Sequence, residues 1–175
     1  MQLTKAFEQG VCVMAMLTTQ PVGVPLGSQS IHKHLGTSAT YIQKIVRKLV
    51  VSGLVTSVSG QRGGFMLAKP ANEISYLDVV EAIEGPVETF PTTNLIDRVL
   101  GDTVDGDTVN KADSALHKSF NLADQAWRQV LAKTTLQDLV YESLNGEEIR
   151  PTDWNNESSR NSLLVRKLLK GGEKA

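Results

Sequence analysis

Apolar residues near the start of the chain recur at steps of three and four: Leu3, Phe7, Val11, Met14 and Leu17. This spacing places them on one side of a helix and predicts a helix over residues 3–18. Two prolines follow within the next seven residues, and they predict a loop.

A shorter helix is predicted over residues 28–35. Ser28 or Ser30 is placed to cap its start, because a serine oxygen can accept a hydrogen bond from a free amide there. Gly36 ends the helix, since glycine tolerates the left-handed conformation common at helix ends. Two helices joined by such a turn are typical of a helix-turn-helix.

The next helix begins after a cap at Thr37 or Ser38 and covers residues 38–52. One side of it is an apolar core stripe: Ile42, Ile45, Val46 and Leu49. The other side has hydrogen-bonding and cationic groups and no carboxylate: Ser38, Thr40, Tyr41, Gln43, Lys44, Arg47 and Lys48. A recognition helix needs this arrangement, because base edges and phosphates are contacted from one side.

A β-hairpin is predicted directly after this helix. Residues 54–58 are rich in β-branched side chains, residues 59–64 form a glycine-rich turn, and residues 65–68 return. A helix-turn-helix followed by a hairpin is a winged helix. The sequence Ser-Tyr-Leu-Asp at 75–78 then predicts a capping box that opens a helix over residues 76–84.

The second half of the chain is expected to hold a dimerisation helix. Residues 85–110 are irregular and are expected to form a loop, and a long helix is predicted over residues 109–133. Its apolar residues repeat with a period of about 3.5, which is typical of a helix-helix seam. The seam consists of Leu116, Phe120, Ala123, Trp127 and Val130. Thr135 with Asp138 predicts a second capping box and a short final helix.

The predicted fold is therefore mainly α with a small β-hairpin, a winged helix-turn-helix followed by a long dimerisation helix. Residues 1–88 form the DNA-binding domain, 89–108 a variable loop, and 109–145 the dimerisation helix and short terminal helix. Residues 146–175 form a polar tail, which is either disordered or folds into one short amphipathic helix.

The N-terminal third of the chain is basic and the remainder is acidic. Residues 9–72 contain six Lys or Arg and no Asp or Glu, whereas residues 73–175 contain 18 acidic and 11 basic side chains. The formal net charge of −1 hides this asymmetry. Because the basic part coincides with the predicted winged helix, its expected partner is the phosphate backbone of double-stranded DNA.

Length and composition set wider bounds. A chain of 175 residues, 41% of them hydrophobic, can form one domain, or a small domain with an oligomerisation arm. No apolar run is long enough to cross a membrane, and the N-terminus lacks the apolar core of a signal peptide. The single cysteine, Cys12, excludes an internal disulfide framework and favours a reducing compartment. A cytoplasmic protein without a membrane partner is expected.

Three segments carry a family resemblance: TSATYIQKIVRKLVVSGLV, SVSGQRGGFMLAKP and EISYLDVVEAIEGPVE. They closely resemble the Rrf2 family of bacterial winged-helix transcriptional regulators, over residues 3–88 and again weakly at Trp127 and 135–139. The most specific part is the GLV…GGF block after a recognition helix. The resemblance implies a homodimer that binds a pseudo-palindromic operator, and a repressor is the expected role.

The departures from the family pattern are also informative. Cluster-binding members carry three cysteines between the post-wing helix and the long helix, and residues 85–110 contain none. No iron–sulfur cluster, and no other cofactor, is therefore expected. Gln43 stands where the family often has an acidic residue. A glutamine side chain can both donate and accept hydrogen bonds, whereas a carboxylate only accepts, so a different base preference is expected. Ser59 aligns with an arginine that some relatives insert into the minor groove, and Arg62 is its candidate replacement.

The predicted DNA-binding residues are Ser28, Ser38, Thr40, Tyr41, Gln43, Lys44, Arg47, Lys48, Ser59 and Arg62. Two other functions remain open alongside DNA regulation. One is a protein-interaction module controlled by a metabolic enzyme or protein co-regulator. The other is a sensor with an unknown small effector bound between the post-wing helix and the long helix.

Several residues are expected to be structural or incidental. Cys12 is expected to be a small buried residue, and His32 and His34 are expected to be surface histidines without metal-ligand spacing. Tyr41 has a competing interpretation as a core aromatic residue. The aspartates at 102–107 do not fit the spacing of a calcium loop. No catalytic motif is evident, so an enzyme is not expected.

Overall fold

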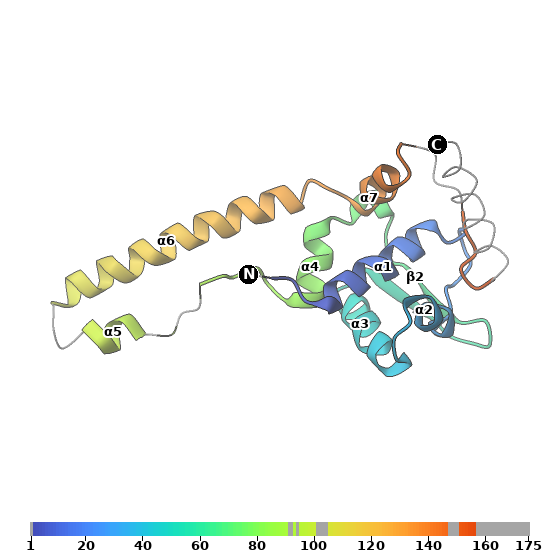
Figure 1. The fold of residues 1–175 in the computed structure, drawn as a ribbon, viewed down its shortest axis with the longest axis horizontal. Coiled ribbons are helices and arrows are strands. Elements are labelled where there is room, and N and C mark those ends of the chain that lie inside the picture. Colours follow the sequence, from blue (N-terminus) through green and yellow to red (C-terminus); the bar gives the residue numbers. More distant parts are fainter. Residues whose placement is uncertain (1, 91–92, 94, 101–104, 147–150, 157–175) are drawn as a thin grey trace, which may run out of the picture.

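The computed structural model describes residues 2–90, 93, 95–100, 105–146 and 151–156. The elements are α1 Lys5–Thr19, α2 Ser28–Leu35, α3 Ala39–Val51, β1 Val55–Val58, β2 Gly64–Leu67, the 3-10 turn η1 Ala71–Glu73, α4 Tyr76–Glu84, α5 Leu95–Leu100, α6 Gly106–Leu131 and α7 Leu136–Ser143. Helices α1 to α4 pack with the hairpin into one body, from which α6 projects as a long arm (Figure 1). The expected winged helix with a long helix after it is confirmed.

The core lies where α1, α3 and α4 meet. The stripe predicted on α3 is buried, and its Ile42 and Leu49 pack with Met14 of α1 and Val79 of α4. Gly10 allows the close approach of α1 to α4, because a Cβ there would lie 3.1 Å from the Ile83 side chain. This packing fixes α3 by one side and leaves its other side to solvent.

The hairpin is a wing anchored to the body by a third segment. β1 and β2 are antiparallel, with Val55 opposite Leu67 and Val58 opposite Gly64. Leu26, before α2, pairs with Phe65 of β2 through two backbone hydrogen bonds of 2.9 Å. A Cβ at Gly64 would overlap the Leu26 carbonyl, so this pairing requires glycine at that position.

Both predicted capping boxes are present. Ser75 and Asp78 exchange backbone and side-chain hydrogen bonds at the start of α4, and Thr135 and Asp138 do the same at α7. The α2 cap was predicted wrongly. Its N-cap is Gly27, which has no side chain, and Ser28 is already the first helical residue.

Two further expectations about the second half are corrected. The segment expected to be a loop contains α5, and α6 begins at Gly106, because Asp105 caps its first turn by accepting from the Thr108 amide at 3.0 Å. Part of the polar tail is ordered, because residues 151–156 pack against the winged helix. The amphipathic helix expected near residues 163–169 lies outside the described residues.

The arm is attached to the body at its C-terminal end. Arg128 of α6 forms a 2.9 Å ion pair with Glu81 of α4, and the buried Asp124 accepts from the amide and hydroxyl of Thr89 at 3.0 and 2.7 Å. Within the described ranges no helix is both long and apolar enough to span a bilayer.

Candidate nucleic-acid interface

Helix α3 presents its polar side to solvent. The Ser38 hydroxyl caps the helix by accepting from the Tyr41 amide at 3.3 Å. Every residue predicted to contact DNA on this helix is exposed: Ser38, Thr40, Tyr41, Gln43, Lys44, Arg47 and Lys48. Tyr41 is 37% exposed, which rules out the competing interpretation as a core residue. The sequence pattern therefore places these side chains on one accessible surface.

Lys48 differs from the other cations of α3. Its ammonium group donates a hydrogen bond to the carbonyl of Ile83, in the last turn of α4. A lysine is favoured there, because the carbonyls at a helix C-terminus carry partial negative charge. In this conformation Lys48 joins α3 to α4, whereas Lys44 and Arg47 have no ion pair within the described residues.

A shallow pocket of about 410 Å³ lies between α3 and α4. Lys44, Arg47, Lys48, Val51, Ser52, Glu81 and Ala82 line it. Its carboxylate, on Glu81, is already neutralised by Arg128 at 2.9 Å. The net character of this pocket is therefore basic, and it extends the cationic surface of α3 toward α4.

The wing places two of the predicted residues at its tip. Ser59 and Arg62 are both exposed, in the turn between β1 and β2. Gly60 in this turn has a φ of 114°, a conformation that other residues rarely adopt. In Figure 1 the wing tip and α3 lie on the side of the body opposite α7. Both can face one ligand without obstruction from the arm.

Ser28 lies at the start of α2, half-buried. The backbone amide of the preceding Gly27 donates to the Asn155 side-chain oxygen at 2.8 Å. Sequence reasoning missed Asn155, because the two residues are 128 positions apart and no local pattern connects them.

The apolar seam of α6 is accessible. Leu116, Phe120 and Val130 are 42%, 39% and 64% exposed. Phe120 also stacks on Phe90 of its own chain, with ring centroids 4.9 Å apart. Exposed apolar residues in a row along a projecting helix are typical of a protein contact surface.

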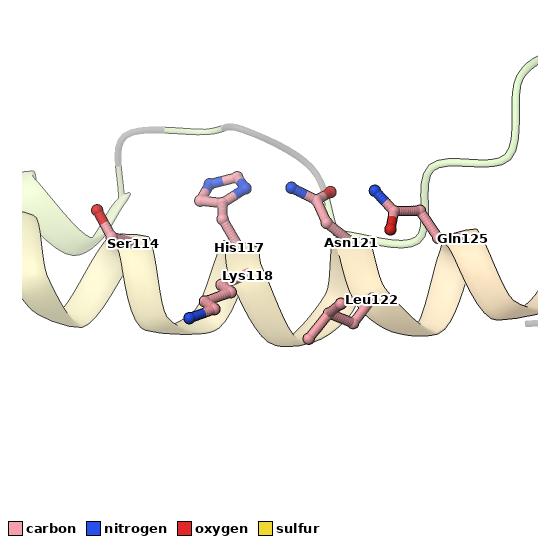
Figure 2. Close-up of a pocket in the computed structure, with 6 residues that line it drawn as sticks. All are labelled: Ser114, His117, Lys118, Asn121, Leu122 and Gln125. Carbon is pink, nitrogen blue, oxygen red and sulfur yellow. The ribbon is translucent and has the colours of Figure 1, made fainter.

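A small effector was expected between the post-wing helix and α6, and neither the pocket between α3 and α4 nor the pocket on the arm has that position. The pocket on the arm, of about 400 Å³, has only α6 residues around it: Ser114, His117, Lys118, Asn121, Leu122 and Gln125. Figure 2 shows these side chains spread along a single helix. It is a depression on a helix surface rather than an enclosed cavity.

Three structural expectations are corrected. Cys12 is exposed rather than buried. Partial desolvation and the nearby Glu8 carboxylate raise the pKa of its thiol. His32 and His34 are half-buried rather than surface residues. His32 pairs with the Thr37 carbonyl, and His34 Nε2 lies 3.0 Å from the Trp154 carbonyl oxygen.

The residues present do not fit an iron–sulfur cluster. The whole sequence contains one cysteine, and it lies on α1. Within the described residues, no three His, Cys, Asp or Glu side chains are grouped so that they could hold a metal ion. Such clusters are held mainly by several cysteine thiolates.

A winged helix with an exposed, carboxylate-free recognition helix defines the class of protein: DNA-binding transcriptional regulators of the helix-turn-helix type. The chain belongs to the Rrf2 family, whose profile, described as "Iron-dependent Transcriptional regulator", matches residues 3–142. This confirms the resemblance found in the sequence.

Individual relatives agree with this assignment. YwgB of Bacillus subtilis, which carries the name of an HTH-type transcriptional regulator, is 30% identical over 157 residues, 88% of this chain and 94% of YwgB. The structure of CymR, titled the global cysteine regulator of B. subtilis, superposes with a TM-score of 0.60 at 22% identity, over 81% of this chain and 98% of CymR. The oxidized form of CymR from Staphylococcus aureus gives a TM-score of 0.57 at 26% identity, over 80% of this chain and 96% of that protein.

Proposed function

We propose that this protein is a homodimeric, sequence-specific repressor of transcription that binds a pseudo-palindromic operator. The observation that carries the proposal is the exposed side of α3, where Gln43, Lys44 and Arg47 lie together without a carboxylate. Such a surface attracts phosphates and can form hydrogen bonds with base edges in the major groove. A repressor needs only to occupy its operator.

The side chains divide into positioning and reading groups. Lys44 and Arg47 contact phosphates or sample base edges, and Ser28 and Ser38 hold the helices on the backbone from their N-termini. Gln43 reads a base, because its amide can pair with adenine through two hydrogen bonds. Thr40 and Tyr41 lie beside it on the same surface and complete the contact.

The wing provides a second contact to the same duplex. Arg62 at the wing tip follows the minor groove, where narrow A·T-rich sequences attract arginine. Ser59, at the other end of the turn, contacts the backbone.

Two-fold symmetry comes from α6. The exposed residues Leu116, Phe120 and Val130, with Ala123 and Trp127, bury one another across two copies of the arm. A two-fold dimer presents two recognition helices related by the same axis, and this relation selects an operator with two inverted half-sites.

We further propose that the protein acts without an iron–sulfur cluster. The support is the composition: one cysteine, on α1, cannot supply the ligand set that a cluster needs. Any regulatory signal would therefore act on the protein by a route other than cluster chemistry.

The function is tested by selection from a random pool of DNA duplexes with the purified protein, followed by sequencing at two salt concentrations. The expected result is one enriched motif made of two inverted half-sites, with centres about 10 base pairs or a multiple apart. Retention should fall steeply as salt rises. A protein-interaction module would enrich no sequence, and a motif without two-fold symmetry would contradict the dimer.

A further inference from the structure

Residues 152–155, here called the C-terminal strap, lie across the junction between α1 and α2. The Thr152 amide donates to the Thr19 carbonyl at 2.7 Å. The indole N–H of Trp154 donates to the Thr19 hydroxyl at 2.8 Å, and its backbone amide donates to the Gln20 side chain at 3.0 Å. Gln20 in turn donates to Asp153 at 3.1 Å. The strap is therefore tied to the end of α1.

Asn155 forms hydrogen bonds with residues 25 and 27, on either side of the Leu26 bridge that anchors the wing. Leu26 uses its own amide and carbonyl to pair with Phe65 of β2, so the neighbouring Pro25 carbonyl and Gly27 amide point away from the wing. The Asn155 side chain satisfies both: its nitrogen donates to Pro25 at 3.0 Å, and its oxygen accepts from Gly27 at 2.8 Å. One side-chain amide thereby satisfies both backbone groups on the outer side of this bridging segment.

The same Asn155 oxygen also contacts a side chain in the first turn of α2. It accepts from the Ser30 hydroxyl at 3.2 Å, and the N-cap residue, Gly27, makes no side-chain cap hydrogen bond. The Ser28 hydroxyl, one residue away, has no hydrogen bond within the part of the chain that the structure describes.

The strap also contacts the far end of α2. His34 lies edge-on against the Trp154 ring, with centroids 5.3 Å apart, and its Nε2 is 3.0 Å from the Trp154 carbonyl. Trp154 is partly buried against the main core. Both ends of α2 are thus fixed by residues 154 and 155, which lie beyond the family match at residues 3–142.

We propose that Asn155 and Trp154 are positioning residues for DNA binding. They hold the N-terminus of α2 where the free Ser28 hydroxyl and the first-turn amides can bind a DNA phosphate. This inference rests on the proposed function. The strap acts through the start of α2 rather than by touching DNA, so the part of its effect that passes through the Ser28 hydroxyl depends on that serine being present.

The test is a double-mutant cycle on a duplex that carries the most enriched sequence from the selection. Asn155→Ala is expected to weaken binding about threefold to tenfold, because the hydrogen bonds that it removes are each worth a modest amount. Ser28→Ala should weaken the wild-type protein about threefold but the Asn155→Ala protein hardly at all. Lys44→Ala should have its full effect in both backgrounds, because Lys44 lies on another helix.

Two further variants separate positioning from general stability. Asn72→Ala removes an exposed asparagine elsewhere and should leave affinity unchanged. Trp154→Phe removes the bond to Thr19 but keeps a ring against His34, so it should fold and weaken binding by less than Asn155→Ala. Binding is measured well below the melting temperature of each variant. A purely structural role would lower that temperature and leave the cycle additive.

The outcomes are distinct. Unchanged affinity in both strap variants, tighter binding, or a Ser28→Ala loss of full size in the Asn155→Ala protein would each overturn the inference, and tighter binding would show the strap to be inhibitory. If the wild-type protein enriches no DNA at all, the proposed function fails and the strap proposal fails with it.

Discussion

The ammonium group of Lys48 on α3 donates a hydrogen bond to the backbone carbonyl of Ile83 on α4. Lys44, one turn earlier on the same helix, is exposed and has no ion pair among the described residues. Two lysines that look equivalent in the sequence therefore have different surroundings. One stabilises the packing of α3 on α4, and the other is free to meet a phosphate.

This difference predicts that the same substitution at the two lysines affects two different properties, DNA binding and stability. Lys44→Ala should weaken binding to all DNA sequences alike and lower the slope of log K against log salt by about one per subunit. Lys48→Ala should instead lower the free energy of unfolding by about 1 kcal/mol, with a smaller change in slope. Salt titrations and thermal unfolding of both variants decide the matter. Equal slopes for the two variants would show that Lys48 leaves Ile83 when DNA binds.

The exposed seam of α6 predicts a dimer that charge can disrupt. Leu116→Asp with Val130→Asp should shift the protein to monomer at micromolar concentration, because buried carboxylates without partners are costly. DNA affinity should fall at least tenfold as the second half-site contact is lost. Sedimentation velocity measures the mass.

Leu122 offers a matched control, since it is 58% exposed on the same helix but outside the seam. Leu122→Asp should leave the dimer intact. A dimer that survives the double substitution but dissociates with Leu122→Asp would place the interface on another side of the arm.

The sequence predicts features whose cause is local. The two sides of α3, the αL turn at Gly36 and the capping boxes at Ser75 and Thr135 all depend on residues within four positions of each other, so periodicity and capping rules find them.

Features that depend on distant partners could not be predicted in this way. The Lys48–Ile83 contact spans 35 residues, and the Asn155–Gly27 contact spans 128. The polar composition near residue 155 is compatible with disorder. Nothing in the local sequence shows that the Gly27 amide finds its acceptor there. Cys12 was expected in the core because it lies near the apolar stripe, but it is exposed and lies outside the set of buried residues of α1.

Cys12 is predicted to be a slow thiol rather than a redox sensor. Partial burial, and then the Glu8 carboxylate, raise its pKa, so less thiolate is present at neutral pH than for a free cysteine. Alkylation by iodoacetamide should be slower in the folded protein than in urea, and its rate should rise at higher pH than for an unperturbed thiol. Glu8→Gln should speed the reaction modestly. Faster reaction in the folded protein would contradict the raised pKa.

Iron should not affect DNA binding. With one cysteine in the chain, protein purified without oxygen should be colourless and contain no stoichiometric iron or sulfide. Treatment with a chelator should leave its affinity for DNA unchanged. Iron and acid-labile sulfide in fixed proportion to protein would show that a cluster binds through ligands not recognised in the sequence.

The central claim is that α3 reads bases from its exposed side, and Gln43 tests it most directly. Binding of wild-type protein and of Gln43→Ala is measured on a panel of duplexes with single-base changes across the selected operator. The variant is expected to lose about 1–3 kcal/mol on the preferred sequence and to stop discriminating at one position in each half-site. A loss of equal size on every duplex in the panel would contradict the account, because Gln43 would then contact the backbone and the bases would be read elsewhere.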